Sequence, residues 1–397
     1  MIICADRIAA GDRSTVWENM AVCIQNGTIV RIGTLDELTA AYPTEAVAAY
    51  PGCTLMPGMI DLHVHLACVQ DPSYYDKYNT VSLCALYAAG HMRKTLAAGV
   101  TTIRDACSAH GIGTALQKAA ADGYILAPRI FACLQGICMT GGHGSDSLSD
   151  AVIEADGVDE VRKAVRLNYK RGANCIKVLT SEGYRGQEMN QEELNAAAAE
   201  AHRFGMKAAA HAGYGDSIEM CIQAGFDSIE HGSHLTLEQV QRMAEKGITW
   251  VPTVLVFNHV YENAVKDERN LGDLQGKPSV VTYLRSCVDS YQANLRAFYD
   301  TGVRVATGTD TDCTTTYRGA SPVAVECAYL VKCGLTPLEA IECATKNGAD
   351  YLGMGDCLGQ VREGYIADVI LVEGDPTADI EALARVKAVY QAGKQVI

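Results

Sequence analysis

The sequence predicts an α/β protein, a (β/α)8 TIM barrel with a small β-sandwich domain formed by both chain termini. Two observations lead to this fold class. Short apolar runs alternate with helical stretches through the middle of the chain, and strand-like segments without intervening helices occupy its two ends. We therefore expect residues 58–357 to form the barrel, and residues 1–57 together with 358–397 to form the small domain.

The two chain ends carry the pattern of short strands joined by turns. Residues 20–25 and 28–33 flank Asn26 and Gly27, the dipeptide most typical of a two-residue β-hairpin turn. Residues 359–373 and 386–397 have the same character. Strands at both ends, with a different pattern between them, predict one β domain assembled from the first and last parts of the chain.

The middle of the chain contains eight short apolar runs, the number that a closed barrel requires. They are residues 59–63, 101–105, 130–133, 175–179, 207–211, 228–231, 250–253 and 304–308. Helical stretches between them include 86–97, 158–171, 191–204, 217–224 and 237–246, and these are followed closely by glycines 99, 172, 205, 225 and 247. A doubly wound sheet is the alternative, but no run is followed by Gly-x-Gly-x-x-Gly or a phosphate-binding loop.

Composition excludes several classes of partner. The chain has 397 residues with 33 basic and 47 acidic side chains, a net charge of −14, which argues against nucleic acid or an anionic membrane as the partner. No apolar run approaches the roughly 18 residues of a membrane span. The 16 cysteines are scattered and the first residues lack an export signal. We expect a cytoplasmic protein that uses cysteine as a core residue.

Polar side chains stand at the ends of several predicted strands, where barrel enzymes place their active sites. These are His63, His65, His211, His231 and Asp310. His63 and His65 are two residues apart, so a strand directs both to one face. Each residue alone has an ordinary structural explanation, in the core or in a turn. Together, four histidines and a carboxylate are costly to bury without a shared cation, so they predict a metal site.

Lys177 lies between apolar neighbours in the fourth predicted strand. A lysine that protects a sheet edge is one explanation, but a barrel has no edges. Schiff-base chemistry is a second, but it does not require four nearby histidines. A third is that the neutral amine captures carbon dioxide as a carbamate, which can bridge two metals about 3.5–4 Å apart.

These residues belong to an ordered set of motifs that covers nearly the whole chain. The set comprises residues 57–66, 99–105, 140–144, 176–178, 211, 228–232, 307–310, 334–341 and 364–369. It resembles the amidohydrolase superfamily, and within it the branch of metal-dependent Xaa-Pro dipeptidases and imidazolonepropionase-like proteins.

The resemblance implies a binuclear centre with two divalent metal ions, usually zinc. Its ligands would be His63, His65 and Asp310 for one metal and His211 and His231 for the other, bridged by Lys177 as N6-carboxylysine and by a hydroxide. The resemblance also implies that Asp310 carries the proton from the hydroxide to the leaving nitrogen, and that His143 contacts the substrate. Two cations lower the pKa of bound water and polarise a carbonyl group.

The predicted function is therefore hydrolysis of an amide C–N bond by attack of the metal-bridging hydroxide, in a dipeptide or an N-acyl amino acid. This would make the protein a metallopeptidase of dipeptidase or carboxypeptidase type. The chain departs from this branch at residues 211–214, where it reads His-Ala-Gly-Tyr and many relatives read His-Ala-His-Gly, so that one pocket histidine is absent. It departs again where Phe257 replaces a tyrosine frequent in peptide-cleaving relatives. Tyr214 or Arg318 could replace that tyrosine in contacting the substrate.

Three alternatives remain. One is a hydrolase of cyclic amides or amidines, as in imidazolonepropionase-like proteins. A mononuclear deaminase of the same fold typically has a glutamate soon after the third histidine and lacks the lysine, whereas this chain has Gly213 and Lys177. A non-catalytic scaffold would be expected to lose metal ligands, and none is missing. We expect a small-molecule substrate and, from the family, a homo-oligomer.

Overall fold

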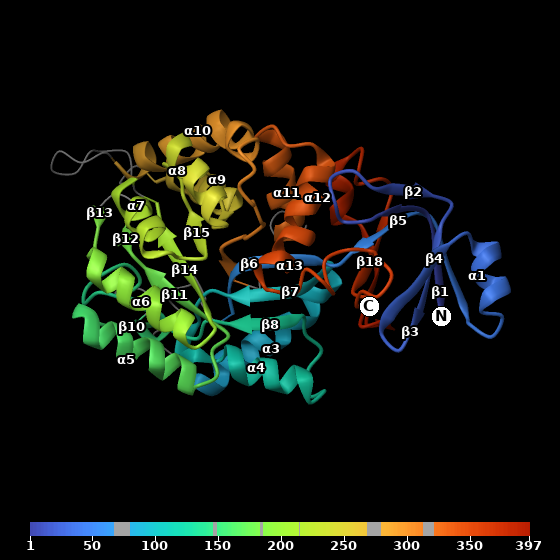
Figure 1. Cartoon of the computed structure of the whole chain (residues 1–397), viewed down its shortest axis with the longest axis horizontal. Coiled ribbons are helices and arrows are strands. Elements are labelled where there is room, and N and C mark those ends of the chain that lie inside the picture. Colours follow the sequence, from blue (N-terminus) through green and yellow to red (C-terminus); the bar gives the residue numbers. More distant parts are fainter. Residues whose placement is uncertain (67–79, 146–148, 183–185, 214, 268–278, 313–320) are drawn as a thin grey trace.

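The protein is described by a computed structural model for residues 1–66, 80–145, 149–182, 186–213, 215–267, 279–312 and 321–397. Figure 1 shows a larger region of strands surrounded by helices, beside a smaller region of strands where both chain termini lie. Within the described ranges, no helix combines the length and apolar character needed to cross a membrane.

The smaller region is one sheet built from both ends of the chain, in the order β20-β19-β18-β5-β1-β3-β4 with β2 paired to β1. β5 connects the two ends, because it pairs in parallel with β1 and antiparallel with β18. The described strands form a single sheet, and the two-sheet sandwich stays a prediction. The elements are β1 (Ile2–Ala9), β2 (Val16–Glu18), β3 (Ala21–Gln25), β4 (Thr28–Gly33), α1 (Leu35–Ala41), β5 (Val47–Pro57), β18 (Val369–Glu373), β19 (Val386–Gln391) and β20 (Lys394–Gln395).

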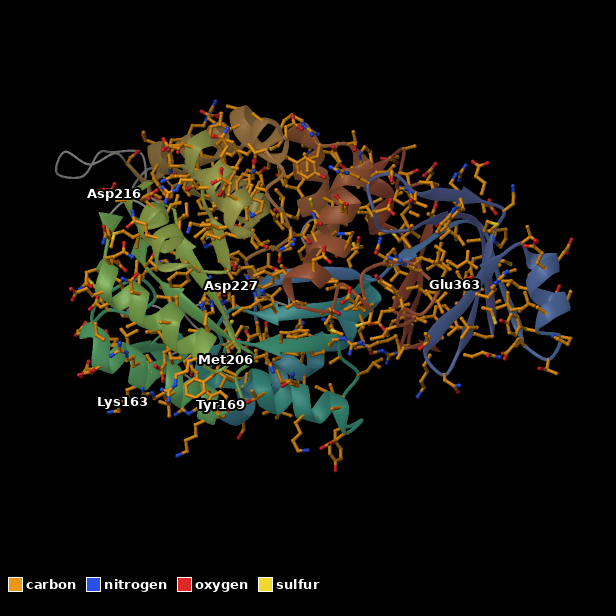
Figure 2. All side chains as sticks on the ribbon, viewed as in Figure 1. Lys163, Tyr169, Met206, Asp216, Asp227 and Glu363 are labelled. Carbon is orange, nitrogen blue, oxygen red and sulfur yellow. The ribbon has the colours of Figure 1, made fainter. Side chains whose placement is uncertain are left out.

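β3 and β4 form the hairpin predicted around Asn26 and Gly27. Both turn residues are left-handed, with φ of 50° and 78°, as a two-residue hairpin turn of this type requires. The last part of the chain holds this hairpin in place. The amide of Ile32 donates to Glu363 Oε1 at 2.9 Å, and Figure 2 labels Glu363 beside the terminal strands.

The larger region contains two sheets of parallel strands. Their orders are β10-β9-β11-β14-β15-β16 and β17-β6-β7-β8, and with the surrounding helices they give a TIM-barrel-like α/β fold. The strands are β6 (Met59–His65), β7 (Val100–Asp105), β8 (Arg129–Ala132), β9 (Gly136–Cys138), β10 (Val152–Glu154), β11 (Cys175–Leu179), β14 (Lys207–Ala212), β15 (Ser228–His231), β16 (Thr249–Val251) and β17 (Thr311–Asp312), with a separate pair β12 (Ser181–Glu182) and β13 (Gly186–Gln187).

Seven of the eight predicted barrel runs coincide with strands β6, β7, β8, β11, β14, β15 and β16. The eighth, residues 304–308, is not a regular strand, and it forms only an isolated parallel bridge between Val305 and Trp250. Its backbone nevertheless connects the two parallel sheets. Trp250 N donates to Arg304 O at 2.8 Å, and Leu62 N donates to Thr307 O at 2.9 Å.

Helices cover the outside of the parallel sheets (Figure 1). The five glycines expected after helices all have positive φ, between 70° and 91°, which is the left-handed conformation that ends a helix. The structure adds helices that we did not assign from the sequence, including α4 and α9 to α13. The bounds are α3 (Val81–Ala97), α4 (Gly113–Ala121), α5 (Gly157–Lys170), α6 (Gln191–Arg203), α7 (Gly215–Ala224), α8 (Leu237–Lys246), α9 (Val254–Ala264), α10 (Val280–Tyr299), α11 (Pro322–Lys332), α12 (Pro337–Cys343) and α13 (Lys346–Tyr351).

Asp368 joins the terminal sheet to the barrel. Its carboxylate accepts hydrogen bonds from Arg129 on β8 at 3.1 Å and from the amide of Ala392 at 2.6 Å. Its carbonyl oxygen accepts from the amide of Gly58, between β5 and β6. The Asp368 side chain is 1% exposed and that of Arg129 is 32% exposed. Asp368 therefore contacts three separate segments, two through its carboxylate and one through its backbone carbonyl.

We expect Asp368→Ala to lower the free energy of unfolding by about 2 to 3 kcal/mol. Breaking a fully buried ion pair typically costs about 3–5 kcal/mol. The expected loss is smaller here because Arg129 remains partly hydrated. The midpoint of urea denaturation measures the change. Lys118→Ala is the control, because it removes only the exposed pair with Asp122 and should cost less than about 0.5 kcal/mol. Equal midpoints for the two variants would contradict the role given to Asp368.

Candidate functional site

The predicted site residues come from the ends of neighbouring parallel strands. β6 supplies His63 and His65, β14 supplies His211, and β15 supplies His231. Asp310 follows the segment that connects the two parallel sheets, and its amide donates to the carbonyl of His63 at 2.7 Å. Because parallel strands place their carboxyl ends on the same side, the fold collects these side chains at one end of the barrel region.

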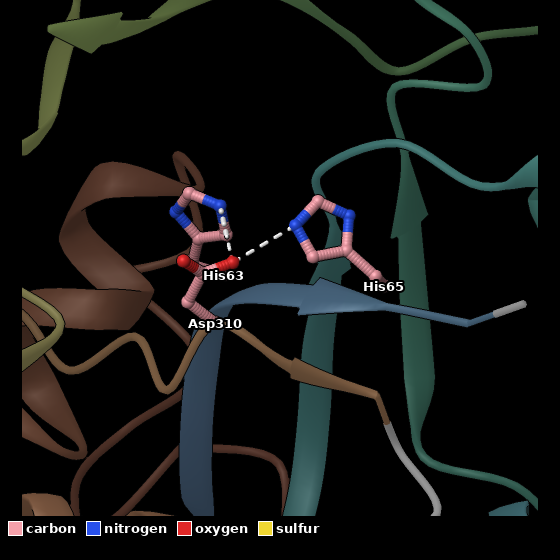
Figure 3. A group of neighbouring side chains, drawn as sticks. All are labelled: His63, His65 and Asp310. Carbon is pink, nitrogen blue, oxygen red and sulfur yellow. Dashed lines mark hydrogen bonds and ion pairs between the residues drawn. The ribbon is translucent and has the colours of Figure 1, made fainter. Parts of the chain in front are cut away.

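His63, His65 and Asp310 form a group that could hold a metal ion, since their ligand atoms all lie within 4.8 Å of one another. Figure 3 shows both rings turned toward the Asp310 carboxylate. The distances to Asp310 Oδ1 are 3.0 Å from His65 Nε2 and 3.5 Å from His63 Nε2. Imidazole nitrogens and a carboxylate oxygen are a donor set that zinc favours.

His211 and His231 lie beside this group. The ring of His231 is 5.1 Å from that of His63 and 4.5 Å from that of His211, measured between centroids. Burial lowers the pKa of both side chains well below the usual histidine value. Neutral imidazole is the form that binds metals. The structure therefore brings all four predicted histidines into one cluster.

Lys177 lies in the interior of β11, which pairs with β14 on one side and β9 on the other. Its side chain is 1% exposed, and Nζ is 3.1 Å from His63 Nε2. Within the described residues, the Lys177 amine forms no ion pair with a carboxylate. Burial lowers the pKa of Lys177, and the positive charge of Arg104 adds to this effect against the opposing carboxylates. The amine is thus pushed toward its neutral form.

Asp310 combines an unusual backbone with a strongly acidic side chain. Desolvation raises the pKa of its carboxyl, but His63, His65 and His231 outweigh it and hold the pKa below the usual range. Its φ is 53°, and His231 has a φ of 67°. Such left-handed conformations cost about 1–3 kcal/mol each in residues other than glycine, and they concentrate at functional sites.

The predicted substrate contacts lie at the edge of the cluster. The ring of His143 stacks on that of His211 at 4.2 Å, and its amide donates to Glu188 at 2.8 Å. The partly buried ring of Phe257 packs edge-to-face against His231, with 5.7 Å between the ring centroids. Tyr214 and Arg318 lie outside the described residues, so their predicted substrate contact stays a prediction.

Several buried charged residues next to the cluster were given no role from the sequence. Asp61 accepts from the amide of His63 and from Thr309, and burial raises its pKa to about 7. Arg104 and Glu230 form a fully buried ion pair of 2.6 Å. Both follow an isoleucine inside a strand, as Lys177 does, although a polar residue comes after each of them. A charged residue after an isoleucine in a predicted strand could therefore have identified them.

His231 and the start of α9 depend on further contacts that the sequence did not reveal. His231 Nδ1 is 2.7 Å from Thr253 Oγ1, and Thr253 has a left-handed φ of 52°. The next two amides, of Val254 and Leu255, donate to the buried Glu326 at 2.9 and 2.7 Å. Burial raises the pKa of Glu326 to about 8. Glu326 lies far along the chain in α11, so sequence spacing gave no indication of this contact.

The cysteines behave as the sequence predicts. Of the 14 cysteines in the part of the chain that the structure describes, 12 are buried and none is in a disulfide bond. No cysteine belongs to the group of possible metal ligands found among the described residues.

Comparison with known proteins identifies the family. Residues 54–396 match the Amidohydrolase family over most of the chain. The chain belongs to this family. Residues 21–44 additionally match the imidazolonepropionase-like composite domain of bacteria. The predicted branch is confirmed, and this amidohydrolase is a hydrolase acting on carbon–nitrogen bonds.

Three relatives illustrate the branch. Ochratoxinase from Aspergillus niger is 32% identical, with 99% of this chain and 85% of that protein covered, and its crystal structure gives a TM-score of 0.85. A Xaa-Pro dipeptidase with bound methionine is 28% identical, with 99% and 98% of the chains covered and a TM-score of 0.86. Imidazolonepropionase from Haloarcula marismortui is 26% identical, over 99% of this chain and 92% of that protein.

Gly308 allows the connecting segment to approach His63 closely. A Cβ at position 308 would lie 2.7 Å from the Cβ of His63 and 2.4 Å from Val251 Cγ1. We expect Gly308→Ala to displace His63 and to cost about 1–3 kcal/mol of folding free energy through overpacking. Zinc affinity, measured by competition with a chromophoric chelator, should fall by at least about tenfold, as it does when metal ligands are misdirected.

Gly90→Ala in α3 is the matched control, because a Cβ there meets no atom within 4 Å. Alanine also favours a helix interior by about 0.5–1 kcal/mol over glycine. If Gly308→Ala binds zinc as tightly as Gly90→Ala, the close approach does not position His63.

Proposed function

We propose that the chain is a binuclear metal-dependent amidohydrolase that cleaves the amide C–N bond of a dipeptide or an N-acyl amino acid. The observation that carries this proposal is the buried amine of Lys177, 3.1 Å from His63 within a cluster of four histidines and Asp310. An unpaired ammonium is costly in such a position, whereas a carboxylated amine is a natural ligand between cations.

The donor set fits two divalent ions, of which zinc suits imidazole and carboxylate best. His63, His65 and Asp310 would hold one ion, and His211 and His231 would hold the other. When bound, such ions polarise a carbonyl group and lower the pKa of water. The three-residue group that the structure brings within 4.8 Å supports the first ion, and the adjacent pair of rings supports the second.

Lys177 would become N6-carboxylysine by reaction with carbon dioxide. The lone pair of neutral Nζ attacks the carbon atom, an N–C bond forms, one C–O π bond becomes the carboxylate, and one proton leaves to solvent. The lowered pKa of Lys177 supports this step, because only the neutral amine is a nucleophile. The product is an anion at a position where the histidines present their nitrogen atoms.

Asp310 would act as the proton carrier of the reaction. Its carboxylate is ionised at neutral pH, because neighbouring histidines depress its pKa, and it can accept a proton from the attacking water. Transfer of that proton to the leaving nitrogen allows the amine to depart in neutral form. His143 and Phe257 border the cluster and would contact the substrate.

The relatives support an amide substrate of small size. Their names describe an ochratoxinase, a Xaa-Pro dipeptidase and an imidazolonepropionase. The imidazolonepropionase-like match at residues 21–44 lies in the terminal sheet, away from the histidine cluster, so it gives no argument for a cyclic substrate. Closure of the barrel, a cytoplasmic location and a homo-oligomer stay predictions.

We expect Lys177→Ala and Asp310→Asn each to abolish amide hydrolysis while the protein remains folded. The first removes the carbamate and the second removes the proton carrier, and a loss of at least about 10²-fold is typical for such groups. Initial rates and circular dichroism measure activity and fold. Lys163→Ala is the control, because Lys163 is an exposed lysine on α5 (Figure 2). Activity retained in either site variant would overturn the mechanism.

Metal content tests the binuclear centre separately. We expect two zinc ions per chain in elemental analysis and carbon dioxide bound at Lys177 in a crystal structure of the loaded protein. One zinc ion with an unmodified lysine would instead indicate a mononuclear enzyme of the deaminase type.

A substrate screen identifies the bond that is cleaved. Zinc-loaded protein would be incubated with dipeptides, N-acyl amino acids and cyclic amides, and products would be detected by mass spectrometry. We expect turnover of dipeptides or N-acyl amino acids. Turnover of cyclic amides alone would show that the proposed substrate class is wrong.

A further inference from the structure

Arg104 crosses the interior of the barrel region beneath the histidine cluster. Its side chain is completely buried, and each of its nitrogen atoms donates to a partner. Nε donates to the carbonyl of Leu62, Nη1 donates to Tyr351 Oη at 2.7 Å and to Ser228 Oγ at 3.2 Å, and Nη2 donates to Glu230 Oε2 at 2.6 Å. This set fixes the guanidinium plane.

Glu230 joins this guanidinium to the cluster. Its Oε2 atom accepts from Arg104 and also lies 2.8 Å from His63 Nδ1. Its other oxygen, Oε1, accepts from Ser228 Oγ. Arginine is always charged in proteins, so its close partner is a carboxylate, which can only accept hydrogen bonds.

The proton on His63 follows from this pairing. Because Glu230 can only accept, Nδ1 of His63 must carry the hydrogen, and in the neutral ring Nε2 then keeps its lone pair. Nε2 is the atom that faces the cluster, 3.1 Å from Lys177 Nζ and 3.5 Å from Asp310 Oδ1. The ion pair of Arg104 and Glu230 thus leaves the lone pair on His63 Nε2 directed toward the cluster.

Two other histidines of the cluster, His65 and His231, are also held through Nδ1, but by uncharged groups. His65 Nδ1 is 2.8 Å from the backbone carbonyl of Cys107, and His231 Nδ1 is 2.7 Å from the hydroxyl of Thr253. A carbonyl or a hydroxyl group provides a weaker acceptor than an ionised carboxylate. The Nδ1 atom of His63 instead lies within hydrogen-bond distance of the Glu230 carboxylate, and its Nε2 atom is the one next to Lys177.

We propose that Arg104 and Glu230 are positioning residues that fix the proton of His63 on Nδ1 and direct its Nε2 atom to a metal ion. The inference rests on the proposed function for the presence of the metal. The placement of the proton belongs to the protein itself and can be measured without metal.

The test compares three forms of the full-length protein. Glu230→Gln keeps an oxygen that can accept from both Arg104 and His63. The double variant Arg104→Met with Glu230→Leu removes the acceptor without leaving a buried unpaired charge, and such replacements generally keep the fold. Arg166→Met with Glu200→Leu is the control for loss of an Arg–Glu pair elsewhere, because it removes a partly exposed 2.7 Å pair between α5 and α6, away from the cluster.

Zinc affinity is the first readout. We expect the Arg104 and Glu230 double variant to bind zinc about 10- to 100-fold more weakly than the wild type, as is typical when the partner of a metal-binding histidine is lost. Glu230→Gln should recover most of this affinity, and the control pair should not change it. A double variant that binds within threefold of the wild type would overturn the proposal.

The second readout is the tautomer of His63 in metal-free protein, from nitrogen-15 NMR of histidine-labelled samples assigned with His63→Gln. We expect a protonated Nδ1 in the wild type and in Glu230→Gln, and a mixture of tautomers in the double variant. Protonation of Nε2 in the wild type would overturn the proposal. If the wild type bound no zinc but kept the Nδ1 proton, the proposed function would fail while the positioning role stood.

Discussion

The parallel register of the central strands is the constraint on which the candidate site depends. Pairing of β11 with β14 sets Leu179 opposite His211, and pairing of β14 with β15 sets Ala212 opposite His231. A slip of one residue would turn every side chain of a strand to its other face. The positions of the candidate site residues therefore depend on the backbone hydrogen bonds between these strands. The bare backbone of Gly308 completes the arrangement, because it lets the connecting segment lie against His63.

Opposite charges on different strands pair in the interior of the barrel region. Arg104 on β7 and Glu230 on β15 cancel each other, and the histidines around them are held neutral by burial. The ionised carboxylate of Asp310 adds a negative charge at the cluster, and carboxylation of Lys177 would add another. A buried excess of negative charge is costly in the absence of cations. The low dielectric of the interior would also strengthen the attraction of these carboxylates for the proposed divalent ions.

Much of this arrangement could be predicted from residues close in sequence, and the remainder could not. Local sequence patterns predicted three features: the hairpin at Asn26 and Gly27, the glycines that end helices, and the histidines at strand ends. Residues 304–308 failed as a regular strand because their hydrogen bonds are divided between two sheets. Glu326 on α11 accepts hydrogen bonds from amides at the start of α9, and sequence spacing gives no indication of such a contact. Arg104 and Glu230 each follow an isoleucine in a predicted strand, but their pairing could be known only from the fold.

The position of β5 between β1 and β18 has a consequence for how the protein is made. During synthesis the strands β1 to β5 leave the ribosome first, whereas β18 emerges only after the entire barrel region. Until then, the side of β5 that β18 will cover presents unpaired backbone groups, which can recruit other chains. Folding of the small sheet must therefore wait until β18 has been synthesised, as expected for pairings of high sequence separation. The sheet can be completed only after the whole barrel region has been made.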